Sequence, residues 1–361
     1  MRIAFFGSSL VSSYWNGAAT YYRGLLRALA ERGHRVTFFE PDAFDRQAHR
    51  DMADPDWCEV VVYQPDPLAC ARALRAARAA DLVVKASGVG VLDSFLEEAV
   101  LELKRPNRLV VFWDVDAPAT LERVTHDPSD AFKPLVPRYD AIFTYGGGVP
   151  VIKAYRAIGA RLCRPIYNAL DPATHFPVAA DPRFRADLGF LGNRLPDREQ
   201  RVAEFFLKPA ALLPDREFLL GGAGWPGSQL PPNVRAIGHV GTGDHNAFNC
   251  SATAVLNIAR DSMARVGFSP ATRVFEAAGA GACLITDAWD GIEEFFAPGK
   301  EILVARDGDA VAALVQELAP ERAASIGMAT RRTALARHTY AARALEVEQV
   351  LEGHVVGSIA G

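Results

Sequence analysis

The chain has few of the features that mark secreted or membrane proteins. Its cysteines are scattered without a C-x-x-C pair, and their odd number argues against a disulfide framework. No apolar run approaches the roughly 20 residues that a membrane-spanning helix needs. The opening MRIAFFG is an apolar strand running into a loop, too short for the apolar part of a signal peptide. We therefore expect a cytoplasmic protein with no membrane span, and with reduced thiols at Cys58, Cys70, Cys163, Cys250 and Cys283.

An excess of charge is also absent. The chain has 39 Lys and Arg against 43 Asp and Glu, a formal net charge of -4, and no block of like charges. This balance argues against nucleic acid or an acidic membrane surface as a partner. No sequence period of about 20 to 50 residues indicates a solenoid. A small molecule is the expected partner.

What the sequence does contain is a regular series of short apolar runs. Half of the 361 residues are apolar, and the length suits two domains. Runs of this length, separated by amphipathic stretches, indicate buried parallel strands joined by crossover helices. The fold class predicted is therefore α/β, with two doubly wound Rossmann-like domains. The strands are expected at residues 3–6, 35–39, 59–63, 82–85, 109–113 and 141–145, and at 187–191, 217–221, 234–237, 254–258, 283–286 and 302–304.

A proline-rich stretch separates the two halves. The segment RPIYNALDPATHFPVAADPRF, residues 164–184, has neither helix nor strand periodicity, as is typical of an interdomain linker. We place an N-terminal domain at 1–170, a C-terminal domain at 171–335, and a helix and tail at 336–361. The last amphipathic helix is expected over about residues 331–351.

The most informative segment is RVFEAAGAGACLITDAWDGIEEFFAPGKEILV, residues 273–304. It predicts a helix that starts near Ser269, followed by a run of small residues and a strand. The N-terminus of a helix attracts phosphate, Arg273 offers a forked set of donors, and Glu276 can accept from the hydroxyls of a pentose. Arg273 and Glu276 are equally compatible with an i, i+3 ion pair on a helix packed closely on a sheet. The run of small residues alone does not separate these two interpretations.

Several motifs together resemble a known family. The patterns R-x-F-E-A-x-G-x-G-A and G-I-E-E-F-F-x-P-G-x-E-I are similar to the nucleotide-sugar half of GT-B glycosyltransferases, which have two facing Rossmann-like domains, and most of all to the CgeB-type, or spore-maturation-type, branch. Four further segments match this family in order and spacing. They are the opening strand, loop and helix of the chain, and the segments DLGFLGNRLPDREQRV, VLNIARDSMARVGFSPATRVFE and LARHTYAARALEVEQVLE. The resemblance covers nearly the whole chain and is more specific in its C-terminal half. It implies that the terminal helix crosses back to the N-terminal domain.

The resemblance also implies where the donor binds. A basic loop after the first strand of the second domain would neutralise the leaving diphosphate, because negative charge builds up on that group as the bond breaks. A loop further on would meet the nucleobase. The positions that match, besides Arg273 and Glu276, are Gly192, Asn193, Arg194, Arg198, Val240 and Arg260. The alternative for Arg194 and Arg198 is an ordinary surface position, although two arginines in one glycine-opened loop favour the functional interpretation, and the alternative for Arg260 is a surface pair with Asp261.

The sequence VVFWDVDAP offers a catalytic carboxylate. Carboxylates beyond the carboxyl end of a parallel strand point into the ligand crevice, and one of them could take the proton from an acceptor hydroxyl. We predict Asp116 as this general base, with Asp114 as the second choice. One of the pair could instead cap the helix that starts at Pro118. A D-x-D metal site is the weaker interpretation, because it leaves Arg273 and Glu276 without a purpose, so we expect no metal and no cofactor beyond the co-substrate.

Loops at the ends of other strands complete the prediction. Only Gly7 and Gly17 occupy the first loop, so the G-x-G-x-x-G pattern of dehydrogenases is absent. Asn16 and Gly17 either face the donor or form an ordinary cap and turn. Gly88, Gly147, Asp290 and Gly291 are expected to line the sugar and acceptor cleft, or to serve as turn residues.

One position departs from the wider family. Many retaining enzymes of this architecture carry a second glutamate eight residues before the one that binds the ribose, and here that position is Phe268. The stereochemical course of the transfer therefore stays open, as do the base, the sugar and the acceptor, whether saccharide, protein or small molecule. The expected function is metal-independent transfer of a sugar from a nucleotide-diphosphate sugar to a hydroxyl. The alternatives are a nucleotide-sugar 2-epimerase of the same architecture and a non-catalytic sugar-nucleotide-binding protein.

Overall fold

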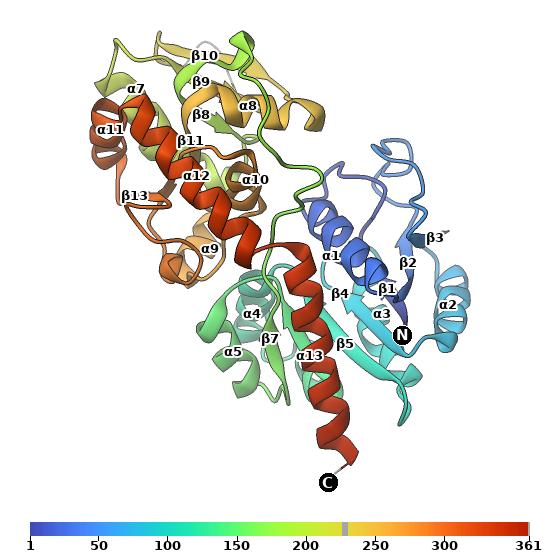
Figure 1. Cartoon of the computed structure of the whole chain (residues 1–361). Helices are drawn as coiled ribbons and strands as arrows, with labels where there is room; N and C mark the ends of the chain where they lie inside the picture. The colour runs from blue at the N-terminus through green and yellow to red at the C-terminus, as the bar shows by residue number, and fades with distance from the viewer. Residues whose placement is uncertain (226–229, 360–361) are drawn as a thin grey trace. The chain divides into compact units, whose positions relative to one another are not determined.

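The computed structural model describes residues 1–225 and 230–359 and divides the chain into two compact units. The first unit comprises Met1–Asn168 and Tyr340–Gly361, and the second comprises Ala169–Thr339 (Figure 1). The two junctions lie two and four residues from the positions predicted at 170 and 336. The chain thus leaves the first unit once, and its last segment returns to it.

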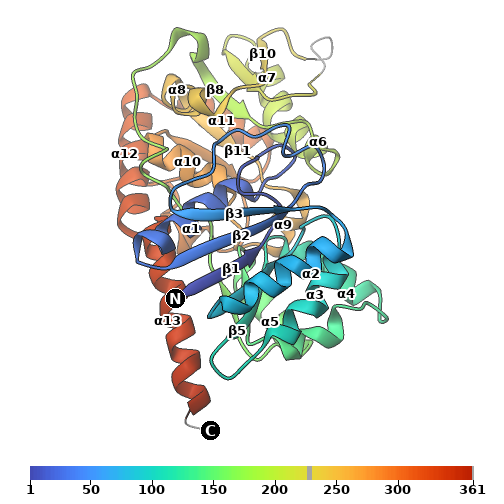
Figure 2. The ribbon, with the colours of Figure 1, turned by 90° about the vertical axis from the view of Figure 1, so that its right-hand side faces the viewer.

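The first unit is built on seven parallel strands in the order β3-β2-β1-β4-β5-β6-β7. Most of their side chains are buried, because helices joining parallel strands cover the faces of the sheet. Figure 2 shows β1, β2 and β3 side by side. The strands are β1 (Arg2–Phe6), β2 (Arg35–Pro41), β3 (Cys58–Tyr63), β4 (Leu82–Ala86), β5 (Leu109–Asp114), β6 (Ala141–Thr144) and β7 (Cys163–Pro165); the helices are α1 (Ala19–Glu31), α2 (Pro67–Ala76), α3 (Asp93–Ala99), α4 (Ala117–His126), α5 (Gly148–Ala157) and α13 (Tyr340–Ile359).

The second unit has six parallel strands in the order β10-β9-β8-β11-β12-β13. Its buried core lies between this sheet and the helices that connect its strands. A π-helical turn, Ala203–Leu207, joins α6 to α7. The strands are β8 (Ala186–Leu191), β9 (Phe218–Gly221), β10 (Val234–Gly238), β11 (Ala252–Asn257), β12 (Leu284–Asp287) and β13 (Leu303–Ala305); the helices are α6 (Pro196–Val202), α7 (Lys208–Leu212), α8 (His245–Ser251), α9 (Asp261–Val266), α10 (Thr272–Ala280), α11 (Gly308–Glu317) and α12 (Pro320–Arg337).

All twelve predicted strands are confirmed, and one further strand was missed. β7 has three residues and ends at Pro165, inside the stretch that the sequence assigns to the linker. It pairs only with β6 and so forms an edge of the sheet. Proline is tolerated there because an edge strand needs fewer backbone donors.

The predicted last helix, at about residues 331–351, is wrong in one respect, because α12 and α13 are separate helices. Residue His338 leaves the helical conformation with φ -128° and ψ 48°. Its carbonyl accepts from the Leu170 amide at 2.7 Å, and its ring bonds the Phe295 carbonyl at 3.0 Å. His338 is also enclosed by the rings of Phe275 and Phe296. These contacts replace the helical hydrogen bonds that would have continued α12.

Helix α13 packs on α1 within the first unit. Gly24 makes this approach possible, since a Cβ atom there would lie 2.1 Å from the ring of Tyr340. At the other end of α1, Glu348 accepts from Arg32 at 2.5 Å and contacts His34 at 2.8 Å. The hydrogen bond from Arg32 lowers the pKa of Glu348. The terminal helix is therefore an integral part of the first unit.

The run of small residues in α10 has a structural use. A Cβ atom on Gly279 would lie 2.3 Å from Leu170 Cδ1 and 2.7 Å from the His175 carbonyl oxygen. The linker thus crosses directly over α10 at this glycine. Likewise, a Cβ atom on Gly327 of α12 would lie 2.0 Å from the carbonyl oxygen of Gly281. Close packing of one segment of the protein on another explains these two positions.

We predict that Gly279→Ala lowers the free energy of unfolding of the second unit by about 1–3 kcal/mol, because backbone atoms must move to admit the methyl group. Denaturant unfolding followed by circular dichroism measures this change. Gly243→Ala is the matched control, since a Cβ atom at Gly243 meets nothing within 4 Å. Equal stability of the two variants would show that the linker does not rest on α10.

Helix length and hydropathy also bear on membrane insertion. Among the residues that the structure describes, no helix is long and apolar enough to cross a membrane.

Candidate functional site

The second unit gathers polar side chains where helices begin. Helix α10 connects β11 to β12, and α8 connects β10 to β11, so both start at the carboxyl edge of the parallel sheet. The two helices pack against each other. His245 is the first residue of α8, and Arg273 and Glu276 are the second and fifth of the nine residues of α10. This edge is where open α/β sheets bind their ligands.

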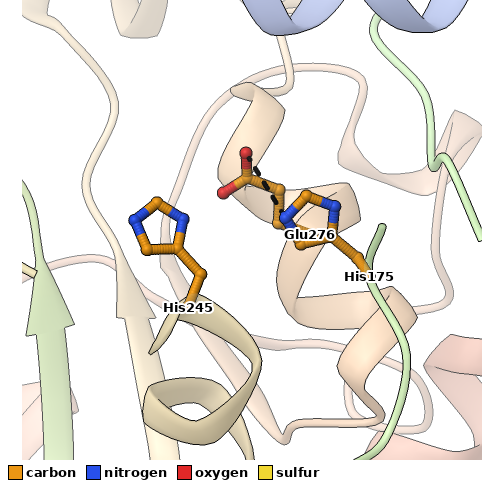
Figure 3. A group of neighbouring side chains, drawn as sticks. All are labelled: His175, His245 and Glu276. Carbon is orange, nitrogen blue, oxygen red and sulfur yellow. Dashed lines mark ion pairs between the residues drawn. The ribbon is translucent and has the colours of Figure 1, made fainter. Parts of the chain in front are cut away.

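Three side chains meet at this edge: His175, His245 and Glu276 (Figure 3). One ligand atom from each lies within 4.8 Å of those of the other two, and His175 Nε2 is 3.9 Å from Glu276 Oε1. Figure 3 shows the carboxylate between the two imidazole rings. Glu276 is only 9% exposed, and its Oε2 is buried without a hydrogen-bond partner. Buried carboxylate oxygens normally accept a hydrogen bond, so an oxygen without a donor indicates that a ligand supplies one.

Neighbouring groups hold both imidazoles in place. His175 Nδ1 is 2.9 Å from the Thr174 hydroxyl, which leaves Nε2 directed at Glu276. The Thr174 carbonyl in turn accepts from Asn246 Nδ2 at 2.9 Å. His245 hydrogen-bonds the backbone of Val240. The linker, the loop after β10 and the start of α8 are thus tied together around the carboxylate.

The charges of the group are coupled. Burial opposes ionisation of Glu276, but the fields of Arg273, His175 and His245 outweigh it, and the pKa of this carboxyl lies below its ordinary value. Burial lowers the pKa of His245, although Glu276 acts in the opposite direction. At neutral pH the site therefore presents an ionised carboxylate at Glu276. Such a carboxylate accepts strong hydrogen bonds from hydroxyl groups.

Arg273 lies one helical turn before Glu276. Its Nη1 is buried without a hydrogen-bond partner, so this guanidinium has an unused donor inside the structure. The first-turn amides of α10 add the positive end of a nine-residue helix. Together these donors suit a diphosphate. The structure brings Arg273 and Glu276 together at one helix start, as the sequence predicts.

The loop after β8 is more fully occupied than the sequence suggests. The Gly192 carbonyl accepts from Trp225 Nε1 at 2.8 Å, and Asn193 Oδ1 accepts from the Ala223 amide at 3.0 Å. Arg194 pairs with Glu199 at 2.5 Å on the surface, while Arg198 donates to the Asn193 carbonyl at 2.7 Å. Exposed pairs of this kind exchange readily with a phosphate, since they contribute little stability.

Two other predicted donor residues lie at the same edge. Val240 is buried after β10 and holds His245 through its backbone. Arg260 precedes α9, where the neighbouring Ala259 amide donates to both carboxylate oxygens of Asp287 at 3.1 Å. Asp287 is fully buried and paired with Arg201. Sequence reasoning did not single out Asp287, whose ion pair ties β12 to Arg201 of α6 and whose bonds to Ala259 tie it to the segment after β11.

Asp290 and Gly291 have a packing role. The Asp290 carbonyl accepts from the Phe268 amide at 2.6 Å, and Gly291 adopts φ +88°. A Cβ atom on Gly291 would lie 2.1 Å from the ring of Phe268. The turn-residue interpretation of Gly291 therefore has a direct structural cause. Phe268, at the position where retaining relatives carry glutamate, itself has φ +49°.

In the first unit, Asp114 and Asp116 have different surroundings. Asp114 is fully buried at the end of β5 and accepts from Ser87 at 2.8 Å, Tyr155 at 2.5 Å and Thr120 at 3.0 Å. It also accepts from the Asp116 amide at 3.1 Å. Burial raises the pKa of Asp114, against the pull of these donors. Asp114 thus braces the turn that presents Asp116 just before α4.

The remaining predicted residues lie in loops of the first unit. Asn16 is buried and its side chain bonds Ser8, Ser9 and Ser12, so its amide serves the loop itself, and Ala18 is the residue before α1. An added Cβ atom on Gly17 would meet nothing within 4 Å. The loop glycines, Gly88 with φ +66° and Gly147 with φ +89°, both follow strands and have backbones that favour glycine.

A hollow of about 720 Å³ also lies in the first unit. It is lined by residues at the starts of β1, β2 and β3, among them Arg2, His34 and Trp57. These are the amino ends of the strands, whereas parallel sheets bind ligands at the carboxyl ends. We therefore assign the functional site to the carboxyl edges and not to this hollow.

Sequence reasoning missed His175 and His245. His175 lies in the stretch assigned to the linker, and His245 is 70 positions further along the chain. Neither belongs to a motif with characteristic spacing, and only the folded chain brings them to Glu276. The prediction of no metal also did not consider this group, whose donor atoms could hold an ion.

Comparisons with known proteins give one family match and several solved structures of similar fold. Residues 198–349 match the family described as "Glycosyl transferase-like". No curated protein sequence matches the chain significantly. Among solved structures, sucrose-phosphate synthase from Thermosynechococcus elongatus is 16% identical with a TM-score of 0.74, covering 99% of this chain and 100% of that one.

Two further structures are similar. HepE from Anabaena, solved with UDP and glucose, is 16% identical with a TM-score of 0.66, covering 98% of this chain and 99% of that one. A glycosyltransferase from Rickettsia africae is 11% identical with a TM-score of 0.64, and each chain covers 98% of the other. These likenesses confirm the predicted fold class of two Rossmann-like units in the GT-B architecture.

Proposed function

We propose that this chain, which has a GT-B fold and matches a glycosyl transferase-like family over residues 198–349, transfers a sugar from a nucleotide-diphosphate sugar to an acceptor hydroxyl. The observation that carries the proposal is the pairing at the start of α10. An ionised, buried Glu276 oxygen without a donor lies one turn from a buried Arg273 donor without an acceptor. The diol of a pentose supplies donors for Glu276, and a diphosphate supplies acceptors for Arg273.

We further propose roles for the surrounding residues. The loop containing Arg194 and Arg198 neutralises the leaving diphosphate, and the backbone around Val240 meets the base. The first unit binds the acceptor, and Asp116 accepts its proton. UDP is the first nucleotide to test, because HepE was solved with UDP.

The transfer is proposed to be metal-independent. A D-x-D ion site needs two carboxylates facing the ligand, but Asp114 is fully buried and holds four donors. The arginines supply positive charge in place of an ion. Membership of the CgeB-type branch and a cytoplasmic location are the finer parts of the proposal, supported by the motifs and the scattered cysteines.

A nucleotide screen tests the proposal. At about 100 times its dissociation constant, a ligand stabilises the state that binds it by roughly 2.7 kcal/mol. For a unit of this size we expect UDP or another nucleoside diphosphate to raise the melting temperature by roughly 5–10 °C. Differential scanning fluorimetry measures the shift.

Turnover then separates the candidate functions. Release of nucleoside diphosphate that depends on an added acceptor supports transfer. An epimerised sugar formed from the donor alone supports the epimerase. Tight binding without turnover for any acceptor supports a binding protein, and the absence of any shift across all nucleotides contradicts a nucleotide site.

A further inference from the structure

The group formed by His175, His245 and Glu276 has a donor set that nucleotide binding does not explain. A pentose needs only acceptors for the hydrogen bonds that its hydroxyl groups donate. The structure instead places two imidazoles beside one carboxylate. We propose that these three side chains bind one transition-metal ion of the Zn²⁺ class. Because Glu276 is a shared ligand, we also propose that the bound ion and the nucleotide exclude each other, and this second part rests on the proposed function.

The donor atoms select the class of ion. Two imidazole nitrogens and one carboxylate oxygen suit Zn²⁺ and its neighbours, whereas Mg²⁺ and Ca²⁺ prefer oxygen ligands throughout. A tetrahedral Zn²⁺ with bonds of about 2.0–2.1 Å has ligand atoms about 3.4 Å apart. The present separation of His175 Nε2 from Glu276 Oε1 is 3.9 Å, and all three ligand atoms lie within 4.8 Å of one another. Small side-chain rotations close this difference, and water completes the fourth position.

The groups around the imidazoles also fit a metal site. Histidines that bind metal usually hydrogen-bond through their other ring nitrogen, which fixes the orientation of the ring. His175 does so with the Thr174 hydroxyl at 2.9 Å, and His245 with the backbone of Val240. The buried Oε2 of Glu276, which is without a partner, supplies the independent sign of a missing ligand.

One charge opposes the ion. Arg273 acts on the same carboxylate, so its positive charge weakens the binding of a cation. The proposal therefore makes a prediction in an unusual direction: Arg273→Met tightens metal binding while it weakens nucleotide binding. A metal held by unrelated surface groups would not respond in this way.

The test uses the full chain without an affinity tag, after treatment with a chelator. Co²⁺ titration followed by visible absorption, and equilibrium dialysis with Zn²⁺, measure binding directly. We expect one ion per chain with imidazole ligation. His175→Ala and His245→Ala should each lose more than roughly 100-fold in affinity, since loss of an outer partner alone typically costs 10- to 100-fold. Thr174→Val should fall in that smaller range, and His126→Ala, an exposed histidine of the first unit, should change nothing.

Several outcomes would overturn the metal site. Wild-type protein that binds neither Co²⁺ nor Zn²⁺ contradicts it without any variant, as do folded His175→Ala and His245→Ala proteins that bind like the wild type. Circular dichroism establishes that each variant is folded.

UDP is then added to the metal-loaded protein. Release of the ion supports mutual exclusion, and simultaneous binding of UDP and metal overturns that part alone. If UDP does not bind even to the metal-free protein, the proposed nucleotide site fails while the dialysis result for the metal stands.

Discussion

Replacing Asp116 with asparagine is expected to lower kcat by roughly 10²- to 10⁴-fold, the range typical of a lost general base. Asparagine keeps the shape of the side chain but cannot accept the acceptor's proton at neutral pH. The KM for donor should change little, because the donor contacts proposed lie on the second unit. Steady-state kinetics with the acceptor in excess measure both constants.

Asp114→Asn is the matched comparison, two residues earlier in the chain, at the end of β5. It disturbs a fully buried carboxylate that holds four donors, so it should lower the free energy of unfolding of the first unit by about 2–4 kcal/mol. Denaturant unfolding should find Asp116→Asn close to the wild type. If Asp114→Asn instead kept full stability and lost turnover, the base would be Asp114 and the assignment to Asp116 would be wrong.

Replacing Glu276 with glutamine is expected to weaken UDP binding by roughly 100-fold. A hydrogen bond to a charged group contributes roughly 1.5–3 kcal/mol, and each 1.4 kcal/mol corresponds to a factor of ten. Glutamine retains one acceptor but loses the charge that Arg273 and the two histidines sustain. Isothermal titration calorimetry measures the loss, and circular dichroism checks that the fold is retained.

The pentose contact has its own control. If Glu276 accepts from the diol, a 2′-deoxy nucleotide should bind wild-type protein less tightly and should be less sensitive to Glu276→Gln than UDP is. Glu293→Gln, at an exposed glutamate in the same unit, should leave UDP binding unchanged. UDP binding of wild-type strength in Glu276→Gln would move the nucleotide to another part of the chain.

The strands were predictable because a buried parallel strand appears in the sequence as a short, continuous apolar run. Runs such as 3–6 and 109–113 are apolar throughout, since both faces of the sheet are covered. β7 has no such apolar run, because it has only three residues and the last is Pro165, and it is a strand only because it pairs with β6. In the same way, the break between α12 and α13 comes from contacts of His338 with Leu170 and Phe295, residues remote in the sequence.

In the candidate site, too, local spacing could be predicted from the sequence, whereas contacts between distant segments could not. Arg273 and Glu276 are three residues apart on one helix, so their proximity follows from helical geometry alone. The roles of Asp114 and Asp116 could not be separated in the sequence, because burial decides between them and burial depends on Ser87, Thr120 and Tyr155. From the sequence, the small residues of α10 are compatible with a ligand site and with close packing. The structure decides for packing at Gly279, because the linker crosses α10 there.

By itself, the sequence determined the two parallel sheets and the spacing of the arginine and the glutamate at the start of α10. Each of these depends on residues close together in the chain, where periodicity and helical spacing govern. Only the tertiary structure decided that His175 and His245 flank Glu276, and that Asp114 is sealed while Asp116 lies at the start of α4. Those facts depend on segments that are distant in the sequence and that the packing of the core brings together. Contacts of this kind produce no local pattern in the sequence.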